Sequence, residues 1–391
     1  MRIDSVDLFY VAMPTILDIG DGSQDALLVR VQADGFVGWG ECEASPLTSI
    51  ASLIAPMSHS ACKPVGANLL GATITDPADI RALGERVRWD SFDLLQAAHT
   101  WSGIDIALWD LLGKQREVPV HELLGPEPAQ PKLPYASVLF GQDPEQTLSI
   151  AKEAAASGFA AVKFGWSDFG RGTVAEDIEQ LAAAREGIGE DVEFMVDAAM
   201  AWGDDAVSAS KRMKSLHDFR VLFLEEPFVP GATRAYRELA LSKGRVGIAA
   251  GEGSSSYEAA ISMIDDAGVD YVQVDAGRVG GITEAFRVAS YAARAGVSYI
   301  NHTFTTHLAL SASLQPFAFD ANSGWCEYPL MPSSLAQALT IDGVPVGADG
   351  RVRIPEAPGL GVTISEEAIR SHLVDVEISV DGTRLFSSPR L

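Results

Sequence analysis

From Tyr135 onwards, short apolar segments alternate with helix-like segments, and this alternation constrains the fold more than any other feature of the chain. Eight strands alternating with helices predict a closed parallel barrel. A doubly wound open sheet is the alternative fold, although no Gly-x-Gly-x-x-Gly pattern opens the first strand–helix unit. The strand-like segments read YASVLF, FAAVKFG, VEFMVD, VLFLEEP, VGIAAGE, YVQVDAG, VSYINH and GWCEYP.

One strand–helix–strand unit within this region, residues 270–302, ends both of its strands on chemically active residues. The first strand runs into Asp275, Gly296 ends the helix, and the second strand delivers His302. Neighbouring parallel strands end close together, so Asp275 can hydrogen-bond one ring nitrogen of His302 and leave the other free as a base. A purely structural interpretation stays open, in which Asp275 caps the helix and His302 is a satisfied core histidine.

Ionisable residues recur at the carboxyl ends of the predicted strands. The strands of a parallel barrel end at one rim, where barrel enzymes keep their chemistry. A helix cap or a salt bridge explains any single residue, but not the same position in seven consecutive strands. The sequence therefore predicts an active site at this rim, formed by Lys163, Asp197, Glu225, Glu252, Asp275, His302 and Glu327.

Three consecutive strands carry the carboxylates Asp197, Glu225 and Glu252. Three acids cannot all stay ionised together without a counter-charge. A hard divalent cation with oxygen ligands resolves this conflict, and we predict Mg²⁺. Strand alternation points Phe223 and Glu225 inward together, which favours Glu225 over Glu226 as the ligand.

Lys163 is predicted beside these acids, with His302 and Asp275 across the rim. This set suits the removal of a proton α to a carboxylate that binds the metal, which stabilises the charge formed. Glu327 is predicted to hydrogen-bond the other carboxylate oxygen of the substrate. The alternative for Glu327 is a salt bridge at the end of the barrel.

The residues before the barrel predict a separate α+β domain. Residues 1 to 40 alternate like antiparallel strands with a turn at Asp34-Gly35, and residues 75–125 have the apolar spacing of helices. The proline-rich stretch 125–134 is the candidate linker. The resulting division is an α+β domain at 1–130, a barrel at 131–330, and a segment at 331–391 that returns to the first domain.

Composition excludes several classes of partner. A formal net charge of -24 argues against nucleic acid and anionic membranes. The three cysteines, Cys42, Cys62 and Cys326, are scattered, which favours a reducing compartment without disulfides or a zinc framework. The amino terminus is not a secretory signal, and no apolar run approaches the ~20 residues that span a bilayer. We therefore expect a cytoplasmic protein.

Motifs along nearly the whole chain resemble the enolase superfamily, mandelate racemase subgroup. They are SGIDIALWDLLGK, GFAAVKFG, VDAAMAW, LEEP, AGE, DAGRVGGIT, the Asn-His pair at 301–302, WCE and PEAPGLGV. The resemblance implies an α+β capping domain over a modified (β/α)₇β barrel, and commonly a homo-oligomer. Sites in this superfamily pair a Lys or His base with Mg²⁺. The roles implied are Asp197, Glu225 and Glu252 as Mg²⁺ ligands, Asp275 and His302 as the dyad, Glu327 as the carboxylate-binding acid, and Lys163 as the first lysine of a Lys-x-Lys pair.

The sequence departs from this pattern at Gly165, which replaces the second lysine of the pair. That lysine is the base on the opposite substrate face in racemases, so its loss favours one-base chemistry by His302. Abstraction of the α-proton, followed by loss of the β-hydroxyl, dehydrates an acid sugar (an aldonate or aldarate) to a 2-keto-3-deoxy acid. The chain is therefore predicted to be a carbon–oxygen lyase. Trp166 either takes the place of the lost lysine, lines the pocket, or is a simple core tryptophan.

Two loops of the capping domain, 16–25 and 43–62, are predicted to set specificity, with Ser45, Thr48 and Ser49 as candidates for bonding a polyol chain. Other functions stay open. One is a racemase or epimerase of a 2-hydroxy acid on the same fold, and another is a Schiff-base aldolase that uses Lys163. A non-catalytic binding protein is disfavoured by the complete set of ionisable residues.

Overall fold

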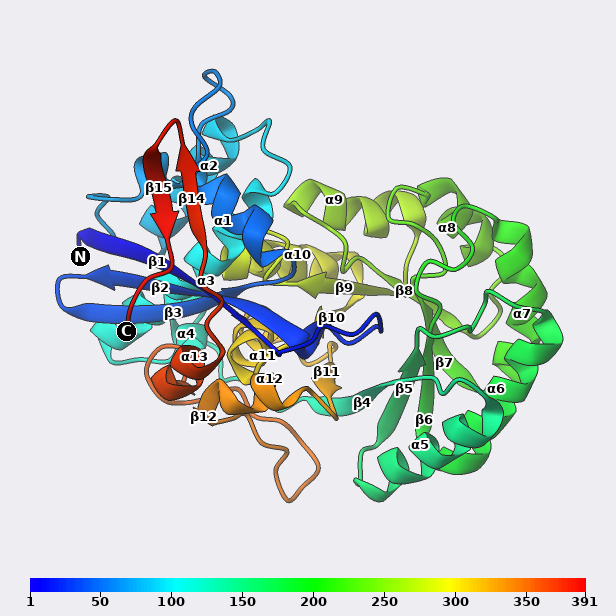
Figure 1. Cartoon of the computed structure of the whole chain (residues 1–391). Helices are drawn as coiled ribbons and strands as arrows, with labels where there is room; N and C mark the ends of the chain where they lie inside the picture. The colour runs from blue at the N-terminus through cyan, green and yellow to red at the C-terminus, as the bar shows by residue number, and fades with distance from the viewer.

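The computed structural model describes residues 1–391, and its chain opens with an antiparallel sheet (Figure 1). β1 (Ile3–Ala12), β2 (Asp25–Ala33) and β3 (Phe36–Cys42) pair in sequence order. The predicted turn between β2 and β3 is confirmed, because Asp34 and Gly35 have φ angles of 48° and 83°, as a tight two-residue hairpin requires.

Helix α3 covers this sheet. Gly40 allows the helix to come close, since a Cβ at this position would lie 2.1 Å from the carbonyl oxygen of Gly103 on α3. The middle of α3 is buried on all sides. The helices of this part are α1 (Pro46–Ile54), α2 (Pro77–Asp90), α3 (Ala97–Arg116) and α4 (Val120–Leu124), with short 3₁₀ turns at Gly22–Gln24 and Val65–Asn68.

The second part is a parallel barrel, as predicted. Its last strand in the sequence pairs with its first, which closes the sheet on that side and makes the open-sheet alternative wrong. The strands are β4 (Leu133–Leu139), β5 (Ala161–Gly165), β6 (Glu193–Asp197), β7 (Val221–Glu225), β8 (Gly247–Ala250), β9 (Tyr271–Asp275), β10 (Ser298–His302) and β11 (Trp325–Pro329).

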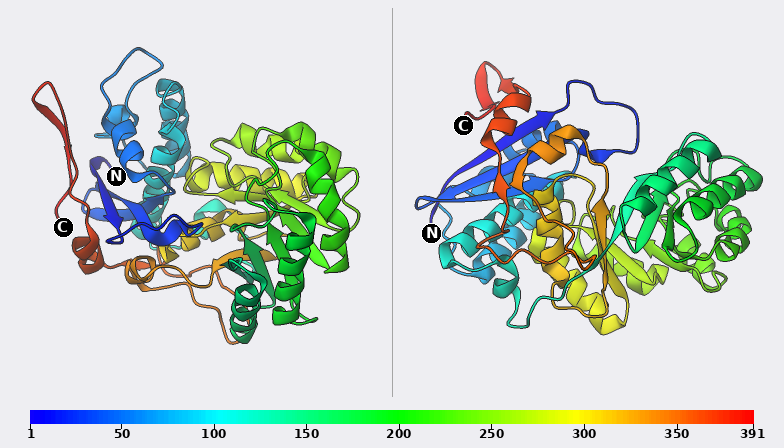
Figure 2. Two further views of the ribbon diagram at one scale, coloured as in Figure 1. Left: turned by 45° about the vertical axis from the view of Figure 1, so that its right-hand side comes forward. Right: turned by 90° about the horizontal axis from the view of Figure 1, so that it is seen from below.

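Helices surround the barrel on the outside (Figures 1 and 2). They are α5 (Pro144–Ala156), α6 (Val174–Ile188), α7 (Ala206–Asp218), α8 (Thr233–Ala240), α9 (Tyr257–Ser262), α10 (Gly281–Ala295) and α11 (His307–Leu314), with a π-helical turn at Met263–Ala267 and a 3₁₀ turn at Gln315–Phe317. The left-handed Gly296 ends α10, as predicted. None of the helices combines the length and the apolar character needed to cross a bilayer.

A side chain joins β10 to β11. The Asn301 amide donates to the carbonyl oxygen of Glu327 at 3.2 Å, and the Glu327 backbone N–H donates to Asn301 Oδ1 at 3.0 Å. Asn301 is fully buried and therefore needs partners for both ends of its amide. It takes the place of a peptide group in the strand ladder.

An apolar layer fills the barrel beneath the rim. Strand alternation turns one side chain from each of six strands into this layer, which is separate from the large core shared by the outer strand faces, the helices and the sheet. The active-site rim stands on this layer. Its members are Tyr135, Ala161, Met195, Phe223, Ala249 and Ile300.

After β11 the chain runs back to the first sheet. Ser333 Oγ donates to the carbonyl oxygen of Ser23 at 2.5 Å, and Val374 N–H donates to the carbonyl oxygen of Tyr10 at 2.8 Å. The hairpin β14–β15 stands beside the first sheet, where both termini also lie (Figures 1 and 2). The elements are α12 (Ser334–Ala338), β12 (Thr340–Asp342), β13 (Thr363–Ile364), α13 (Glu366–His372), β14 (Glu377–Val380) and β15 (Thr383–Ser387). The domain limits at 130 and 330 stay a prediction.

Candidate active site

The predicted ionisable residues gather at the carboxyl rim of the barrel, but not all of them end a strand. Lys163 and Glu327 lie in the middle of β5 and β11, and Glu252 lies two residues beyond β8. The prediction that all seven end their strands is wrong for these three, because tilted barrel strands reach the rim at different heights. The other four, Asp197, Glu225, Asp275 and His302, are the last residues of their strands.

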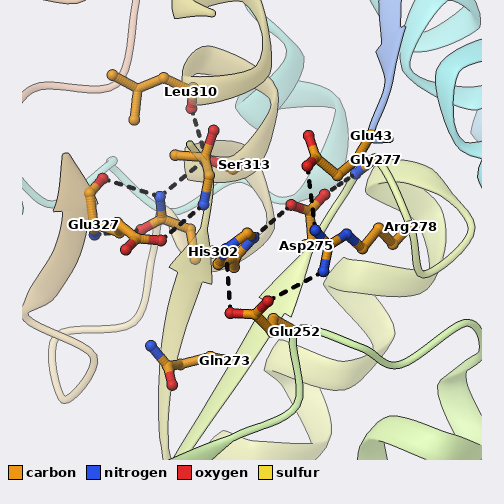
Figure 3. A network of polar contacts seen from close by, with 12 residues as sticks. Glu43, Glu252, Gln273, Asp275, Gly277, Arg278, His302, Leu310, Ser313 and Glu327 are labelled. Atoms are coloured by element: carbon orange, nitrogen blue, oxygen red, sulfur yellow. Dashed lines mark hydrogen bonds and ion pairs between the residues drawn. The ribbon is translucent and has the colours of Figure 1, made fainter. Parts of the chain in front are cut away.

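The structure brings the predicted dyad together (Figure 3). Asp275 and His302 are register partners on β9 and β10, and His302 Nδ1 lies 2.7 Å from Asp275 Oδ2. The Gly277 N–H donates to the other oxygen of Asp275 at 2.6 Å, which fixes the carboxylate. His302 Nε2 points away from Asp275 and lies 3.2 Å from Glu252 Oε2.

The charge on His302 is set by these neighbours. Burial disfavours a charged imidazole, but Glu252, Glu327 and Asp275 outweigh burial and raise the pKa of His302 to about 10. In the other direction, His302 and Arg278 overcome burial and hold the pKa of Asp275 below its usual range. Asp275 is therefore ionised whenever it holds His302.

Lys163 bridges two acids inside the rim. Its Nζ lies 2.8 Å and 2.9 Å from the two oxygens of Glu225 and 2.6 Å from Glu327 Oε1. Burial opposes a charged amine, but Glu225 and Glu327 outweigh it and raise the pKa of Lys163 well above its usual range. Thr303 N–H donates to the second oxygen of Glu327 at 3.0 Å. Lys163 is thus a protonated side chain that links two carboxylates and offsets their repulsion.

The three predicted metal ligands are crowded acids. Asp197 and Glu225 are register partners on β6 and β7. Burial raises the pKa of Asp197 to about 6 and that of Glu225 to about 8; Lys163 opposes both rises, and Glu252 adds to both. An all-carboxylate donor set of this kind fits a hard divalent cation such as Mg²⁺, which would relieve the repulsion.

The carboxylate oxygens of these three residues do not all lie within 4.8 Å of one another; the group with that spacing is His121, Glu122 and Glu356, on α4 and in a later loop. Two of those three side chains are exposed. At the rim, two of the three acids are instead paired with cationic side chains, Glu225 with Lys163 and Glu252 with Arg278 and His302.

Sequence reasoning did not assign two charged residues, Arg278 and Glu43, to this site. Arg278 Nη1 lies 3.2 Å from Glu252 Oε1, and its Nη2 lies 3.2 Å from Glu43 Oε1, so it ties the rim to the capping domain (Figure 3). Glu226 is also buried, and burial, with Glu252 and Asp197 nearby, raises its pKa well above the usual range. The available signals were the position of Arg278 three residues after Asp275, and the position of Glu43 just after β3.

The side of the site opposite the dyad carries Gly165 and Trp166. A Cβ at residue 165 would lie 2.9 Å from both Cβ and Oδ2 of Asp197, so the glycine leaves room for that acid. Trp166 is 40% exposed and packs against Gly20 in the capping-domain loop 16–25. The core-tryptophan alternative is therefore wrong, and Trp166 lines the pocket.

Two adjoining cavities open at the rim. The inner one, of about 260 Å³, contacts Lys163, Asp197, Glu252 and His302, and the outer one has about 990 Å³. Trp166 and residues 19–21 line both. Ser45, Thr48 and Ser49 line neither cavity, because loop 43–62 leads away into α1, whose Ser49 is fully buried.

Two protein-family models match this chain. Residues 146–368 match the enolase C-terminal domain-like family, and residues 10–125 match the N-terminal domain of the mandelate racemase / muconate lactonizing enzyme family. This chain belongs to the enolase superfamily, mandelate racemase subgroup. The resemblance seen in its motifs is thus confirmed, as is the modified (β/α)₇β barrel with its capping domain.

Similar proteins of this superfamily include characterised dehydratases. L-talarate/galactarate dehydratase of Salmonella typhimurium is 30% identical over 80% of this chain and 75% of its own length. D-galactonate dehydratase of Klebsiella pneumoniae is 30% identical over 88% of this chain and 90% of its own length. A crystal structure of a predicted mandelate racemase from Rhodobacter sphaeroides is 49% identical over the whole of both chains, with a TM-score of 0.95. This member of the superfamily is therefore an enzyme, and its characterised relatives include hydro-lyases.

Proposed function

We propose that this protein is a Mg²⁺-dependent dehydratase of an acid sugar, with His302 as its only base. The observation that carries the proposal is the asymmetry of the site. A histidine oriented by Asp275 at 2.7 Å stands on one side, and Gly165 stands where a second base would be on the other. The similarity to dehydratases of galactonate and talarate/galactarate supports the same activity.

His302 performs both proton transfers in this proposal. Because Asp275 occupies Nδ1, Nε2 is the nitrogen that removes the α-proton of the substrate. The electron pair of the broken C–H bond forms the C–C double bond as the β C–O bond breaks. His302 returns its proton to the leaving hydroxyl, which departs as water. The enol that remains becomes a 2-keto-3-deoxy acid.

Asp197, Glu225 and Glu252 would hold Mg²⁺ in this site. When bound, Mg²⁺ supplies positive charge that stabilises the substrate carboxylate as it gains charge and offsets the field of the acids on His302. Lys163 adds a fixed positive charge beside Glu225 and Glu327. Glu327 forms an ion pair with Lys163 through Oε1 and accepts from Thr303 N–H at Oε2, and its predicted contact with the substrate stays a prediction.

The alternatives are less well supported by the site. A Schiff-base aldolase needs a neutral lysine, whereas two carboxylates keep Lys163 protonated. A two-base racemase needs a second base opposite His302, and Gly165 has no side chain to supply it. An epimerase in which another group serves as second base stays the runner-up.

The outer cavity suits the polyol tail of an acid sugar. Ser137, Gln142 and Gln146 line it with groups that hydrogen-bond to hydroxyls. Arg171 is the one basic residue in its lining, beside the acids Asp18, Asp21 and Asp168. This balance disfavours a second carboxylate on the tail, so we expect an aldonate rather than an aldarate.

A panel of mono- and diacid sugars, incubated with protein and Mg²⁺, tests the proposal. Formation of a 2-keto-3-deoxy acid, read as its semicarbazone, is expected from at least one aldonate and is lost on adding a chelator. In D₂O, exchange of the α-proton without loss of water would instead establish the epimerase. A cytoplasmic location and a homo-oligomeric state also stay proposals.

A further inference from the structure

A small cavity lies behind the dyad, between β3 of the capping domain and the ends of β9 and β10. It has a volume of about 10 Å³, and Glu41 lines it from the capping domain. From the barrel side, it is lined by the catalytic pair Asp275 and His302 and by the hydroxyl-bearing residues Thr303 and Thr305. The cavity therefore touches the base from the side that faces away from the substrate.

Three buried polar atoms around this cavity have no hydrogen-bond partner. They are Glu41 Oε1, Thr303 Oγ1 and Thr305 Oγ1. Leaving a buried polar group unpaired is unfavourable, and native proteins pair nearly all such groups. Three unpaired atoms on one cavity indicate a shared partner inside it.

The volume and the chemistry select a water molecule. A cavity of about 10–15 Å³ accessible to a water-sized probe holds one water, provided that two to four polar groups bind it. We propose that Glu41, Thr303 and Thr305 bind one water molecule behind the dyad, and that Glu41 is a positioning residue for His302 and Asp275. The positioning role rests on the proposed function, whereas the water site does not.

Glu41 is held where it can serve this role. It is 2% exposed, and the Thr306 hydroxyl at the start of α11 donates to its Oε2. Burial raises the pKa of Glu41 to about 8; the hydrogen bond from Thr306 and the nearby Thr305 hydroxyl oppose this rise, and the charges of Glu43 and Asp275 add to it. At neutral pH the acid is protonated and can donate to the water. Once ionised, Glu41 would place a second negative charge beside Asp275. This charge would raise the pKa of His302.

Other ionisable groups surround Glu41 and enter any pH dependence. They are Glu43 just beyond β3, Asp275 at the end of β9 and His302 at the end of β10, which line the same cavity as Glu41. A substitution that changes only Glu41 separates its contribution from theirs.

The first experiment is a crystal structure of the protein at a resolution that defines single waters. The expected result is one ordered water within hydrogen-bond distance of Glu41 Oε1 and both threonine hydroxyls. A dry cavity, or direct hydrogen bonds among the three side chains, would overturn the water site.

The second experiment compares kinetics of Thr303→Val, Thr305→Val, Glu41→Gln and Glu41→Ala. Each valine variant removes one hydroxyl and keeps the shape, and we expect kcat to fall about 5- to 20-fold with KM within about twofold. Glu41→Gln keeps a neutral hydrogen-bonding group, so its kcat falls less than that of Glu41→Ala. It also loses the decline in kcat that ionisation of Glu41 imposes on the wild type near pH 8.

Thr340→Val is the matched control, since Thr340 is a buried threonine on β12, away from the dyad. If Thr303→Val, Thr305→Val and Glu41→Gln all match this control in kcat and in pH profile, the positioning role is overturned. If no acid sugar is turned over even by the wild type, the proposed function fails instead, and the crystal structure still decides the water site.

Discussion

The two sides of the active site are built differently. The dyad wall consists of Asp275 and His302 at the ends of β9 and β10, and the open wall consists of Gly165 and Trp166 at the end of β5. Behind the dyad wall lies the capping domain, which hydrogen-bonds to the barrel through the pairs Ser102–Gly280, Asp105–Thr283 and Glu41–Thr306. The open wall faces loop 16–25 and a cavity of about 990 Å³.

This difference separates two tasks. Proton transfer needs a base fixed within a fraction of an ångström, and packed secondary structure supplies that precision. Substrate choice needs a surface that can vary, and loops tolerate variation. Under the proposed function, the chemistry lies on the dyad wall and the contacts to the substrate tail lie on the side of loop 16–25. Substitutions in the dyad wall should therefore lower kcat, whereas removal of Trp166 from the open wall should mainly raise KM.

The largest effect is expected from His302→Asn in the dyad wall. Removing the only base should lower kcat by about 10³-fold or more, because general-base catalysis contributes about 10²–10⁴-fold. Exchange of the substrate α-proton in D₂O should disappear as well. Retained exchange in this variant would show that a group on the open wall removes the proton, and the contrast between the walls would be lost.

A smaller effect is expected from Gly165→Lys, which restores the lysine of racemases to the open wall. The new Cβ would meet Asp197 at 2.9 Å, so we expect kcat to fall about 10- to 100-fold without any inversion of the α-carbon. Gly165→Ala carries the same Cβ without the amine and is the matched control. Chiral analysis of the recovered substrate checks the result, and inverted substrate from Gly165→Lys alone would mean that a second base is accommodated.

Trp166→Ala should affect binding rather than chemistry. The side chain lines both cavities and contacts the loop at Gly20, so its removal should raise KM about 5- to 10-fold and change kcat by less than about threefold. Trp89→Ala, at a tryptophan that is 81% exposed, is the control with unchanged kinetics. A fall in kcat of the same size as the rise in KM would assign Trp166 to the chemistry and weaken the division between the walls.

The smallest effect is expected from Asp105→Asn, in the support behind the dyad wall. Burial raises the pKa of Asp105 to about 8, against about 3.9 in an unfolded chain. A carboxyl group with a raised pKa contributes its stability below about pH 4 and loses it as the pH rises to about 8. The asparagine variant has no proton to lose, so its Tm relative to wild type should increase by a few degrees between pH 5 and 8.

Asp349→Asn is the control for this measurement. The Asp349 side chain is exposed, and its hydrogen bond with Arg353 lowers its pKa to about 2, so it stays ionised across that range. Its effect on Tm should not change between pH 5 and 8. A constant Tm difference for Asp105→Asn as well would show that Asp105 is ionised in the folded protein.

The fold was largely predictable because its signal is periodic. The strand-like segments, the turn at Asp34-Gly35 and the helix end at Gly296 are local patterns, and the structure has all of them. The joining of β10 to β11 was not predictable. It depends on a side chain, Asn301, which substitutes for backbone, and no local pattern encodes such a contact between strands.

The site was predictable where a residue ends its own strand and less so elsewhere. The Asp275–His302 pair followed from adjacency of parallel strands. The pairing of Arg278 with Glu43 was not predicted, because these residues meet across the interface between the two domains and sequence spacing does not report such a contact. Lys163 was predicted at the end of its strand but lies in the middle of β5. The stagger between barrel strands depends on how the whole sheet closes, and the sequence of a single strand does not report it.

The amide of Asn301 has a consequence for how such an enzyme can diversify. The strands that carry His302 and Glu327 are coupled by one rotatable side chain instead of a continuous ladder of peptide groups. Substitutions around this one amide can therefore shift β10 relative to β11, while the other strand pairs keep their register. The relative position of His302 and Glu327 at the rim thus depends on one amide side chain.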